Sequence, residues 1–367
     1  ETLSPLRLQY IDYAEWQNSK EQKEAIKHQE TYWQKQFAGE IPVLELPTDY
    51  MRPQVLDFAG NVLTFEINGS EVRSLKTQAS AEGATFFMIL LAVYNIFLAK
   101  ISGQETIVVG TPTAGRHHAD LEQVIGMFID TLPLKNDPAG EKTVREFLRE
   151  VKEKSFAAFA NQDFQYEDLV ESVVIHRDTG RNPLFDVMFM LHNLEAPGVE
   201  IAGLKLNPYS YTPNTSKFDL TLLCMESEGN LPCSFEYSTR LFKKETIERF
   251  IGYLQNVITA VTANPDSPLW EIDILSEEER QRLEEEFNDT AEEYPTDKTI
   301  FQLFEGQVDK IHDHASLVFK DETMTFGHFD ERANCLANYL RQVEGIQVGN
   351  RVAVLMERSI ELIVSLM

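Results

Sequence analysis

The sequence predicts an α/β fold with a mixed sheet and flanking helices, followed by the opening of a second α/β domain. Strand-like apolar segments alternate along the chain with segments of helical periodicity, which is the pattern of α/β domains. The 367 residues exceed what one ordinary hydrophobic core organises. At "SEEERQRLEEEFNDTAEE" (276–293), nine acidic residues stand against two arginines, as expected of a solvated helix and linker. We therefore predict a main domain over 1–272, an acidic linker over 273–297 and a truncated second domain over 298–367.

The elements expected in the first part follow from apolar periodicity and capping residues. They are, in chain order, a helix at 13–38, a proline-punctuated connection at 41–53, a strand at 61–67, a helix capped by Ser70, a buried helix at 85–101, a strand at 106–112 and a loop rich in Gly, Pro and His at 112–142. Thr85 is placed to cap the buried helix and Gly103 to end it. Because an asparagine and a lysine interrupt its apolar run, which falls short of the roughly 18 residues of a membrane span, we expect a core helix.

The elements expected in the rest of the chain follow from the same criteria. They are helices at 143–160 and 166–174, strands at about 184–192, 201–206, 218–225 and 231–238, a helix at 243–262, a helix at 299–309, a strand at 315–319, a strand, turn and helix over 323–343, a strand at 351–356 and a final helix. The chain does not begin with methionine and it stops inside an apolar pattern, so we expect it to be a fragment of a larger protein.

The net charge limits the classes of binding partner, and the cysteine content indicates the cellular compartment. The formal net charge is −26, from 33 basic and 59 acidic residues, which argues against nucleic acid and anionic membrane surfaces as partners. Three cysteines without metal-ligand spacing are typical of reduced thiols in a cytoplasmic protein. Cys224 and Cys233 are able in principle to pair, although two buried small apolar side chains are the favoured interpretation.

Three polar stretches combine a structural interpretation with a functional one. In "RHHADLE" (116–122) the adjacent histidines point apart in an extended loop, so a loop or helix start is favoured over a metal site or a general base. In "YIDYAEW" (10–16) Asp12 is a candidate helix cap, and Tyr10 and Trp16 favour packing over ligand contact. In "NQDFQYEDLVE" (161–171) Asp163 is likewise a candidate cap, next to Gln162. A fourth stretch, "GMFIDTLPLK" (126–135), has the pattern of a strand or crossover segment and contains Asp130.

The densest polar stretch is "RDTGRNPLFDVMF" (177–189). Asn182 precedes a proline, so its backbone is expected to be extended at the entrance of a strand. Asp178 lies between Arg177 and Arg181 and is expected to neutralise one of them, fixing a planar guanidinium. From the residues alone, a structural ion-pair cluster and a role in a site both stay open.

These motifs together resemble the condensation domain of nonribosomal peptide synthetases. The family patterns are Tyr-x-Asp-Phe/Tyr-Ala-x-Trp, Ile-Gly-x-Phe-Val-Asn-Thr-Leu, His/Asn-Gln-Asp-Tyr-Pro-Phe-Glu and Arg-Asp-x-Ser-Arg-Asn-Pro-Leu, and the four stretches follow them in order over about 190 residues. Downstream, "LSEEERQRLEEEFNDT" resembles the usual bridge to an adenylation domain. "MTFGHFDERAN" (324–334) resembles that domain's first motif. This chain departs from the patterns at Asp130 (Asn in the family), Gln165 (Pro) and Gly180 (Ser).

The resemblance implies a lobe like that of chloramphenicol acetyltransferase, with a truncated adenylate-forming domain after it. The implied activity joins an upstream peptidyl or aminoacyl thioester to a downstream aminoacyl thioester, both presented by carrier proteins on phosphopantetheine. The intact synthetase would use ATP and Mg, while no metal or other cofactor is expected on this fragment itself. The implied partners are the upstream and downstream carrier proteins, an N-terminal lobe and the rest of the adenylation domain.

The same resemblance implies where the site lies. The general base of the family belongs to a His-His-x-x-x-Asp-Gly motif, which "HHADLEQ" does not satisfy, so we expect it upstream and expect this chain to be inactive alone. The residues expected to line or brace the active-site tunnel are Tyr10, Asp12, Trp16, Asp130, Gln162, Asp163, Arg177, Asp178, Arg181 and Asn182. An epimerisation-type relative and a non-catalytic module that binds carrier proteins remain the alternatives.

Overall fold

The chain folds into two compact units, Glu1–Glu284 and Glu285–Met367, and each is described by itself. The computed structural model describes residues 6–116, 118–174, 178–193, 213–226 and 229–367. The boundary between the units falls within the acidic stretch that we expected to be a linker. The finer bounds 1–272, 273–297 and 298–367 remain a proposal.

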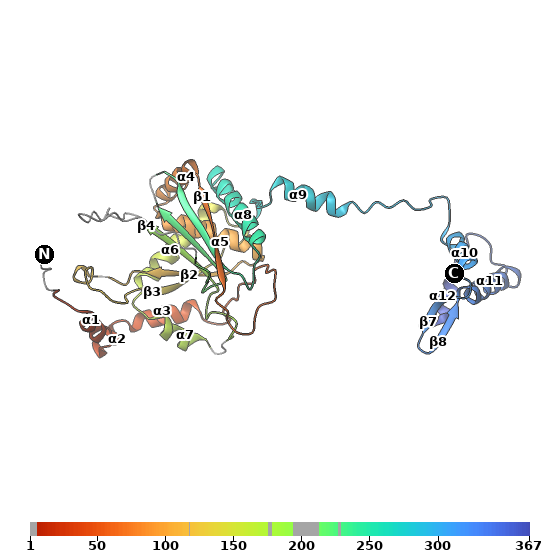
Figure 1. Cartoon of the computed structure of the whole chain (residues 1–367), viewed down its shortest axis with the longest axis horizontal. Helices are drawn as coiled ribbons and strands as arrows, with labels where there is room; N and C mark the ends of the chain where they lie inside the picture. The colour runs from red at the N-terminus through yellow and green to blue at the C-terminus, as the bar shows by residue number, and fades with distance from the viewer. Residues whose placement is uncertain (1–5, 117, 175–177, 194–212, 227–228) are drawn as a thin grey trace. The chain divides into compact units, whose positions relative to one another are not determined.

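A six-stranded mixed sheet organises the large unit (Figure 1), with strand order β1-β6-β5-β4-β2-β3. β4 runs parallel to β2 and β5, and the other neighbouring pairs are antiparallel. The strands are β1 (Gly60–Ile67), β2 (Ile107–Thr113), β3 (Asp130–Asn136), β4 (Val187–Asn193), β5 (Leu220–Glu226) and β6 (Leu231–Ser238). This mixed sheet with flanking helices confirms the predicted α/β fold class.

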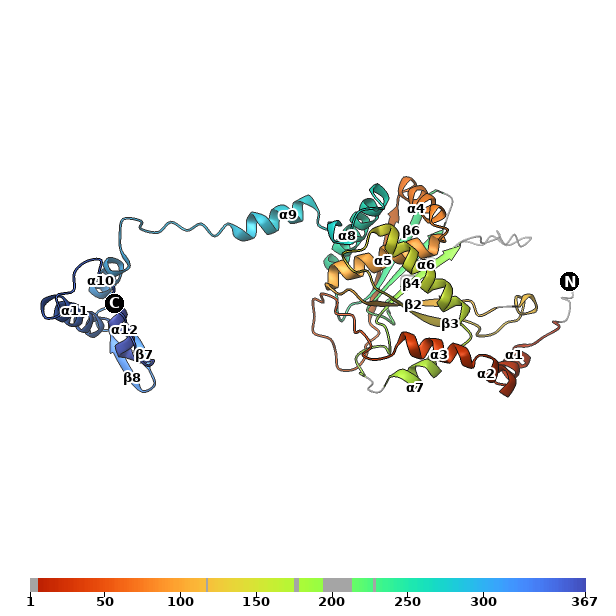
Figure 2. The same ribbon diagram turned by 180° about the vertical axis from the view of Figure 1, so that it is seen from behind.

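Helices cover one face of this sheet. The helices of the unit are α1 (Tyr10–Gln17), α2 (Lys20–Ala25), α3 (Lys27–Gln36), α4 (Gly69–Ala81), α5 (Phe86–Ser102), α6 (Val144–Ala160), α7 (Tyr166–Val173), α8 (Lys244–Ala263) and α9 (Glu277–Glu284). Figure 1 shows strands in front, and Figure 2, the view from behind, shows α5 and α6 in front of them. α3 and α7 lie side by side near β3 in both views. Side chains of α3 bond to residues 161–164, and α7 follows directly after this segment.

The central helix α5 is buried over consecutive residues from Met88 to Leu98, as its largely apolar sequence predicts, and the buried stretch includes Asn95. The Thr85 hydroxyl accepts a hydrogen bond from the backbone N–H of Met88, and Gly103 ends the helix with a φ of 70°. Both caps confirm the prediction. Within the described residues no single helix meets the length and hydropathy of a membrane span; α4 and α5 together do so only as a pair bent by 108°, and α5 belongs to the core.

Several predicted elements were wrong in detail. The helix expected at 13–38 is three helices, because Ser19 accepts a hydrogen bond from Gln22 N and so begins α2. Asn68, rather than Ser70, caps α4 by accepting from the N–H groups of Ser70 and Glu71. The loop expected at 112–142 contains β3, whose seven residues pair antiparallel with β2. The strand expected at 201–206 lies outside the described residues.

The small unit has a core of its own, formed by Met324, Phe329, Ile360 and Val364. Its elements are α10 (Ile300–Ile311), β7 (Ala315–Phe319), β8 (Glu322–Thr325), α11 (Phe326–Gln342) and α12 (Ile360–Leu366). The strand predicted at 351–356 is not formed, and Leu355 within it is 100% exposed. A strand needs a neighbour to satisfy its backbone groups, and in the described part of the chain none pairs with this segment.

Candidate functional site

Three segments that are distant in sequence surround one cavity of about 330 Å³ in the large unit. They are α1 with the start of α2, the segment leading into β3, and the segment that leads into α7. The residues that line the cavity include Tyr10, Tyr13, Trp16, Asp130, Gln162, Asp163, Gln165, Tyr166 and Glu167. Three of the four motif stretches therefore meet at a single concave site of the size that ligand pockets have.

A small aromatic cluster fixes the first two segments against each other. The rings of Tyr10 and Tyr13 lie 5.2 and 4.8 Å from the ring of Phe128, measured between centroids. The Tyr10 hydroxyl donates to the carbonyl of Met127 over 2.9 Å. A Cβ on Gly126 would lie 2.1 Å from the Tyr10 ring, so this close approach requires glycine. Gly126 and Phe128 thus fix the position of α1.

Arg116 completes this cluster from the far side. Its guanidinium lies 4.1 Å from the centroid of the Phe128 ring and donates to the carbonyls of Leu121 and Val124, the latter over 2.7 Å. His118 begins a short 3-10 helix over Ala119–Leu121, which confirms the helix-start interpretation of "RHHADLE". His117 lies outside the described residues. Within the described part of the chain, no three His, Cys, Asp or Glu residues are placed to hold a metal ion.

Buried side chains of α3 hold the third segment in place. The amide oxygen of Gln29, which is 4% exposed, accepts from the N–H groups of Asp163 and Phe164 over 3.0 and 3.1 Å. Its amide nitrogen donates to the Asp163 carboxylate over 3.1 Å. Trp33 donates from its indole to the carbonyl of Asn161 over 2.8 Å. The cap predicted at Asp163 was wrong, because Gln165 precedes α7 and Asp163 instead pairs with Gln29.

Gln29→Leu is expected to lower the free energy of unfolding of the large unit by about 1–2 kcal/mol, because it leaves two backbone N–H groups without their acceptor at similar side-chain volume. Urea unfolding followed by circular dichroism measures this change. Gln34→Leu is the matched control on the same helix, since Gln34 is exposed and donates to the neighbouring side chain of Glu30 over 2.9 Å. Equal effects of the two substitutions would contradict the role given to Gln29.

The cavity is acidic, and Asp130 is its most perturbed group. Burial raises the pKa of Asp130 to about 6, and the charges of Glu167 and Asp163 add to the rise, against hydrogen bonds from the N–H groups of Thr131 and Tyr166. Burial also raises the pKa of Tyr13, with the Asp163 charge second. The described lining residues include no lysine, arginine or histidine. A negative, partly dehydrated wall therefore faces the cavity.

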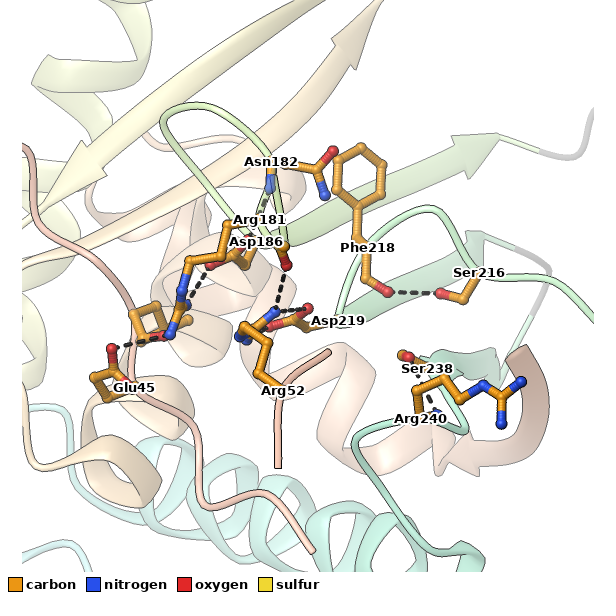
Figure 3. A network of polar contacts seen from close by, with 12 residues as sticks. Glu45, Arg52, Arg181, Asn182, Asp186, Ser216, Phe218, Asp219, Ser238 and Arg240 are labelled. Carbon is orange, nitrogen blue, oxygen red and sulfur yellow. Dashed lines mark hydrogen bonds and ion pairs between the residues drawn. The ribbon is translucent and has the colours of Figure 1, made fainter. Parts of the chain in front are cut away.

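A second polar cluster lies at the entrance of β4 (Figure 3). Arg181 pairs with the buried carboxylate of Asp186 over 2.7 Å and with Glu45 over 2.9 Å, and it donates to the carbonyl of Leu44 over 3.1 Å. The N–H of Asn182 donates to Asp186 over 3.2 Å. Burial raises the pKa of Asp186 and the Asp219 charge adds to the rise, while Arg181 and Arg52 oppose it. This cluster is the ion-pair scaffold that the sequence left open as one alternative.

Asp186, rather than Asp178, neutralises Arg181, which is one of the two arginines that Asp178 was expected to pair with. Asp178 accepts from the N–H of Gly180 over 2.8 Å and so closes its own turn, whereas Asp186 neutralises Arg181. Arg177 lies outside the described residues. The second arginine of the cluster is Arg52, which forms a two-pronged ion pair with the buried Asp219.

Sequence reasoning missed Arg52, Asp186 and Asp219. The available signal was an aspartate inside or beside an apolar strand segment, in "NPLFDVMF" and "KFDLTLL". Such a carboxylate is stable only with a buried cationic or hydrogen-bonding partner. Nothing in the local sequence identifies that partner, because Arg52 is 167 residues from Asp219.

Tyr166 connects the two clusters. Its ring lines the cavity, while its hydroxyl donates to the carbonyl of Pro183 at the entrance of β4. Its ring also lies 5.6 Å from that of Phe185, measured between centroids. The strand entrance braced by Arg181 therefore supports one wall of the cavity.

The predicted site residues fall into two groups. Tyr10, Trp16, Asp130, Gln162 and Asp163 line the cavity, whereas Asp178, Arg181 and Asn182 belong to the second cluster. Asp12 lines a neighbouring cavity with Tyr13 and Trp16. It is not the helix cap we predicted: Gln9 is the cap, and the Asp12 carboxylate accepts from Gln9 N over 2.8 Å.

Two solved structures share the fold of this chain. A four-domain nonribosomal peptide synthetase bound to AMP and glycine superposes with a TM-score of 0.74 at 23% identity, over 95% of this chain and 27% of that chain. The X-domain from teicoplanin biosynthesis superposes with a TM-score of 0.69 at 22% identity, over 74% of this chain and 64% of that one. At these identities the likeness shows a shared fold.

The family follows from sequence matches. Residues 1–284 match the condensation domain family and residues 304–367 match the AMP-binding enzyme family. The chain belongs to the condensation domain family, with part of an AMP-binding enzyme domain after it. This confirms the resemblance seen in the motifs.

Curated relatives place the chain among peptide synthetases. It is 45% identical over 365 residues to bacitracin synthase 3 of Bacillus licheniformis, covering 100% of this chain and 6% of that protein. It is 44% identical over 362 residues to surfactin synthase subunit 1 of Bacillus subtilis (strain 168), covering 99% of this chain and 10% of that protein. The chain thus spans about a tenth or less of the length of these relatives.

Proposed function

We propose that this chain is the C-terminal lobe of an amide-forming condensation domain in a modular nonribosomal peptide synthetase. The observation that carries the proposal is the meeting of three motif segments around one cavity, in a chain whose residues 1–284 match the condensation domain family. The amine nitrogen of a downstream aminoacyl thioester attacks the carbonyl carbon of an upstream acyl thioester. A C–N bond forms, the C–S bond breaks, and the amine loses a proton as the thiol leaves.

The residues of this chain bind and orient rather than transfer the proton in this proposal. Tyr10, Trp16, Asp130, Gln162 and Asp163 form a wall beside the reacting groups, and Asp12 lines the adjoining hollow. Asp178, Arg181 and Asn182 keep the entrance of β4 rigid, so that Tyr166 holds its place in the wall. The assignment of Arg177 to the same bracing role rests on its motif alone.

The partners and cofactors belong to the same proposal. Carrier proteins would present both substrates on phosphopantetheine, which enters as part of the substrate. ATP and Mg would serve the adenylation step, but residues 304–367 contain no Gly-rich phosphate-binding loop, and the described residues bring together no metal-binding group. No step of the proposed condensation reaction uses ATP or Mg. The three free thiols support a cytoplasmic location.

The proton acceptor is proposed to lie outside these 367 residues. The only adjacent histidines are His117 and His118, and no Asp-Gly pair follows them at the family's spacing. The chain alone is therefore proposed to be inactive. The general base would come from a lobe that carries His-His-x-x-x-Asp-Gly.

We expect dipeptidyl product from two loaded carrier proteins only when this chain is fused behind a lobe carrying His-His-x-x-x-Asp-Gly, with none from the chain alone. Mass spectrometry of the carrier-bound products measures the difference. The same fusion with the second histidine changed to alanine is the control.

Each other outcome identifies a different function. Product from the unfused chain would overturn the assignment of the general base. Inversion of the donor α-carbon without amide formation, detected by chiral chromatography, would favour the epimerisation-type alternative. Carrier binding by the fusion without either reaction would favour the non-catalytic module.

A further inference from the structure

Two buried cysteines face each other on the neighbouring strands β5 and β6, in the last residue pair before the chain passes from one strand to the next. Cys224 of β5 lies directly opposite Cys233 of β6 in the antiparallel register, and their sulfur atoms are 3.2 Å apart. The same row continues to Leu191 on β4 and Phe65 on β1, on the face that the helices cover. The two thiols are 1% and 2% exposed. The third cysteine, Cys335, is exposed and belongs to the small unit.

This placement already satisfies the backbone requirement for a disulfide. Residues directly opposite in antiparallel strands have Cα atoms about 4.5–5.5 Å apart, and disulfides span Cα separations of about 4.4–6.8 Å. Neither strand has to slide or separate, because the register pairs the two residues already. A small rotation of the side chains about their Cα–Cβ bonds is enough to bring the sulfur atoms to bonding distance.

We propose that Cys224 and Cys233 form an oxidative modification site, at which hydrogen peroxide converts the thiol pair into a cross-strand disulfide within the folded large unit. One thiol reduces peroxide to water and becomes a sulfenic acid. The second thiol attacks that sulfur, the S–S bond forms and a second water leaves. Two thiols and one peroxide thus give one disulfide and two waters.

Burial explains why the oxidant has to be small and the reaction slow. The hydrogen-bonded contact with the Cys233 thiol and burial both raise the pKa of Cys224, which keeps it protonated near neutral pH. Bulky disulfides cannot reach thiols that are 1% and 2% exposed. The cross-link is therefore expected to form after Cys335 has reacted, and faster as the pH is raised.

The test uses the whole chain with Cys335→Ser, treated with hydrogen peroxide and then unfolded in the presence of an alkylating reagent. Trypsin releases both remaining cysteines on the single peptide 218–240, because no lysine or arginine lies between Lys217 and Arg240. Cleavage after Glu226 or Glu228 then separates the two cysteines, unless a disulfide joins the fragments. We expect joined fragments, resistance to alkylation, and a rate that does not change with protein concentration.

Controls separate this site from chance oxidation. Cys224→Ala should abolish the joined fragments and leave Cys233 open to alkylation after unfolding. The oxidised chain should unfold at higher urea concentration in the large unit only, with the increase reversed by a reductant. The proposal is overturned if both thiols survive peroxide in the folded chain, if they overoxidise separately, or if the link forms only when peroxide is added to the unfolded chain.

Discussion

Arg181→Ala is expected to lower the free energy of unfolding of the large unit by about 3 kcal/mol, because it removes the main cationic partner of a buried carboxylate. The Asp186 side chain is only 5% exposed and accepts from Arg181 over 2.7 Å. Without the guanidinium, Asp186 would face the Asp219 charge with Arg52 alone to offset it. Chemical unfolding followed by tryptophan fluorescence measures the loss.

Arg240→Ala is the matched control for this substitution. Arg240 pairs with Asp57 over the same 2.7 Å, but its side chain is 59% exposed and that of Asp57 is 38% exposed. Exposed ion pairs contribute about 0–1 kcal/mol, so a small change is expected. If the two alanine variants unfold at the same denaturant concentration, burial does not decide the strength of the Arg181 pair.

Asp130→Asn is expected to stabilise the large unit by about 2 kcal/mol at pH 8 and by much less at pH 4. The folded-state pKa of Asp130 is about 6, above the ordinary 3.8, because burial disfavours the charged form. Well below pH 3.8 the carboxyl is neutral in both states, so it carries no penalty. Between about pH 4 and pH 6 the unfolded chain ionises this carboxyl while the folded protein keeps it protonated, so stability falls as the pH rises, and the loss is complete above the folded-state pKa.

Unfolding free energies of the native chain and the Asn variant, measured at intervals from pH 4 to pH 8, test this expectation. The difference between them should grow from pH 4 to about pH 6 and level off above it. Glu153→Gln, at an exposed position on α6, controls for the loss of one negative charge. A pH-independent difference, or the same curve for Glu153→Gln, would rule out a buried carboxyl with a raised pKa.

Local patterns predicted the elements well where one segment contains its own signal. The caps at Thr85 and Gly103 and the strands β1, β5 and β6 follow from short stretches of sequence. β3 was predicted only as one alternative, a strand or crossover segment at 126–135 inside a longer loop, because its central Pro133 argues against a strand when read alone and the strand forms by pairing with β2. The pairing with β2 is a contact in space that the local sequence of β3 does not contain.

The site was predictable as a set of motifs but not as a geometry. The family resemblance identified the segments that line the cavity. It did not identify Tyr13, which lines the cavity, or Gln29, which holds the segment at Asp163 in place. Asp178 was expected to neutralise Arg177 or Arg181 because these residues are close in sequence. The chain turns between Arg181 and Asp186, with Leu184 at a φ of 69°, and this turn brings Asp186 to the guanidinium instead.

The contacts across the entrance of β4 bear on how such domains can be recombined. Glu45 and Arg52 come from the proline-rich connection, whereas their partners Arg181 and Asp219 come from the second half of the sheet. A chimera whose crossover point lies between these regions inherits the two halves of each ion pair from different parents. Domain swaps should therefore take residues 44–56 and 178–219 from the same parent, even though the two stretches are far apart in the gene.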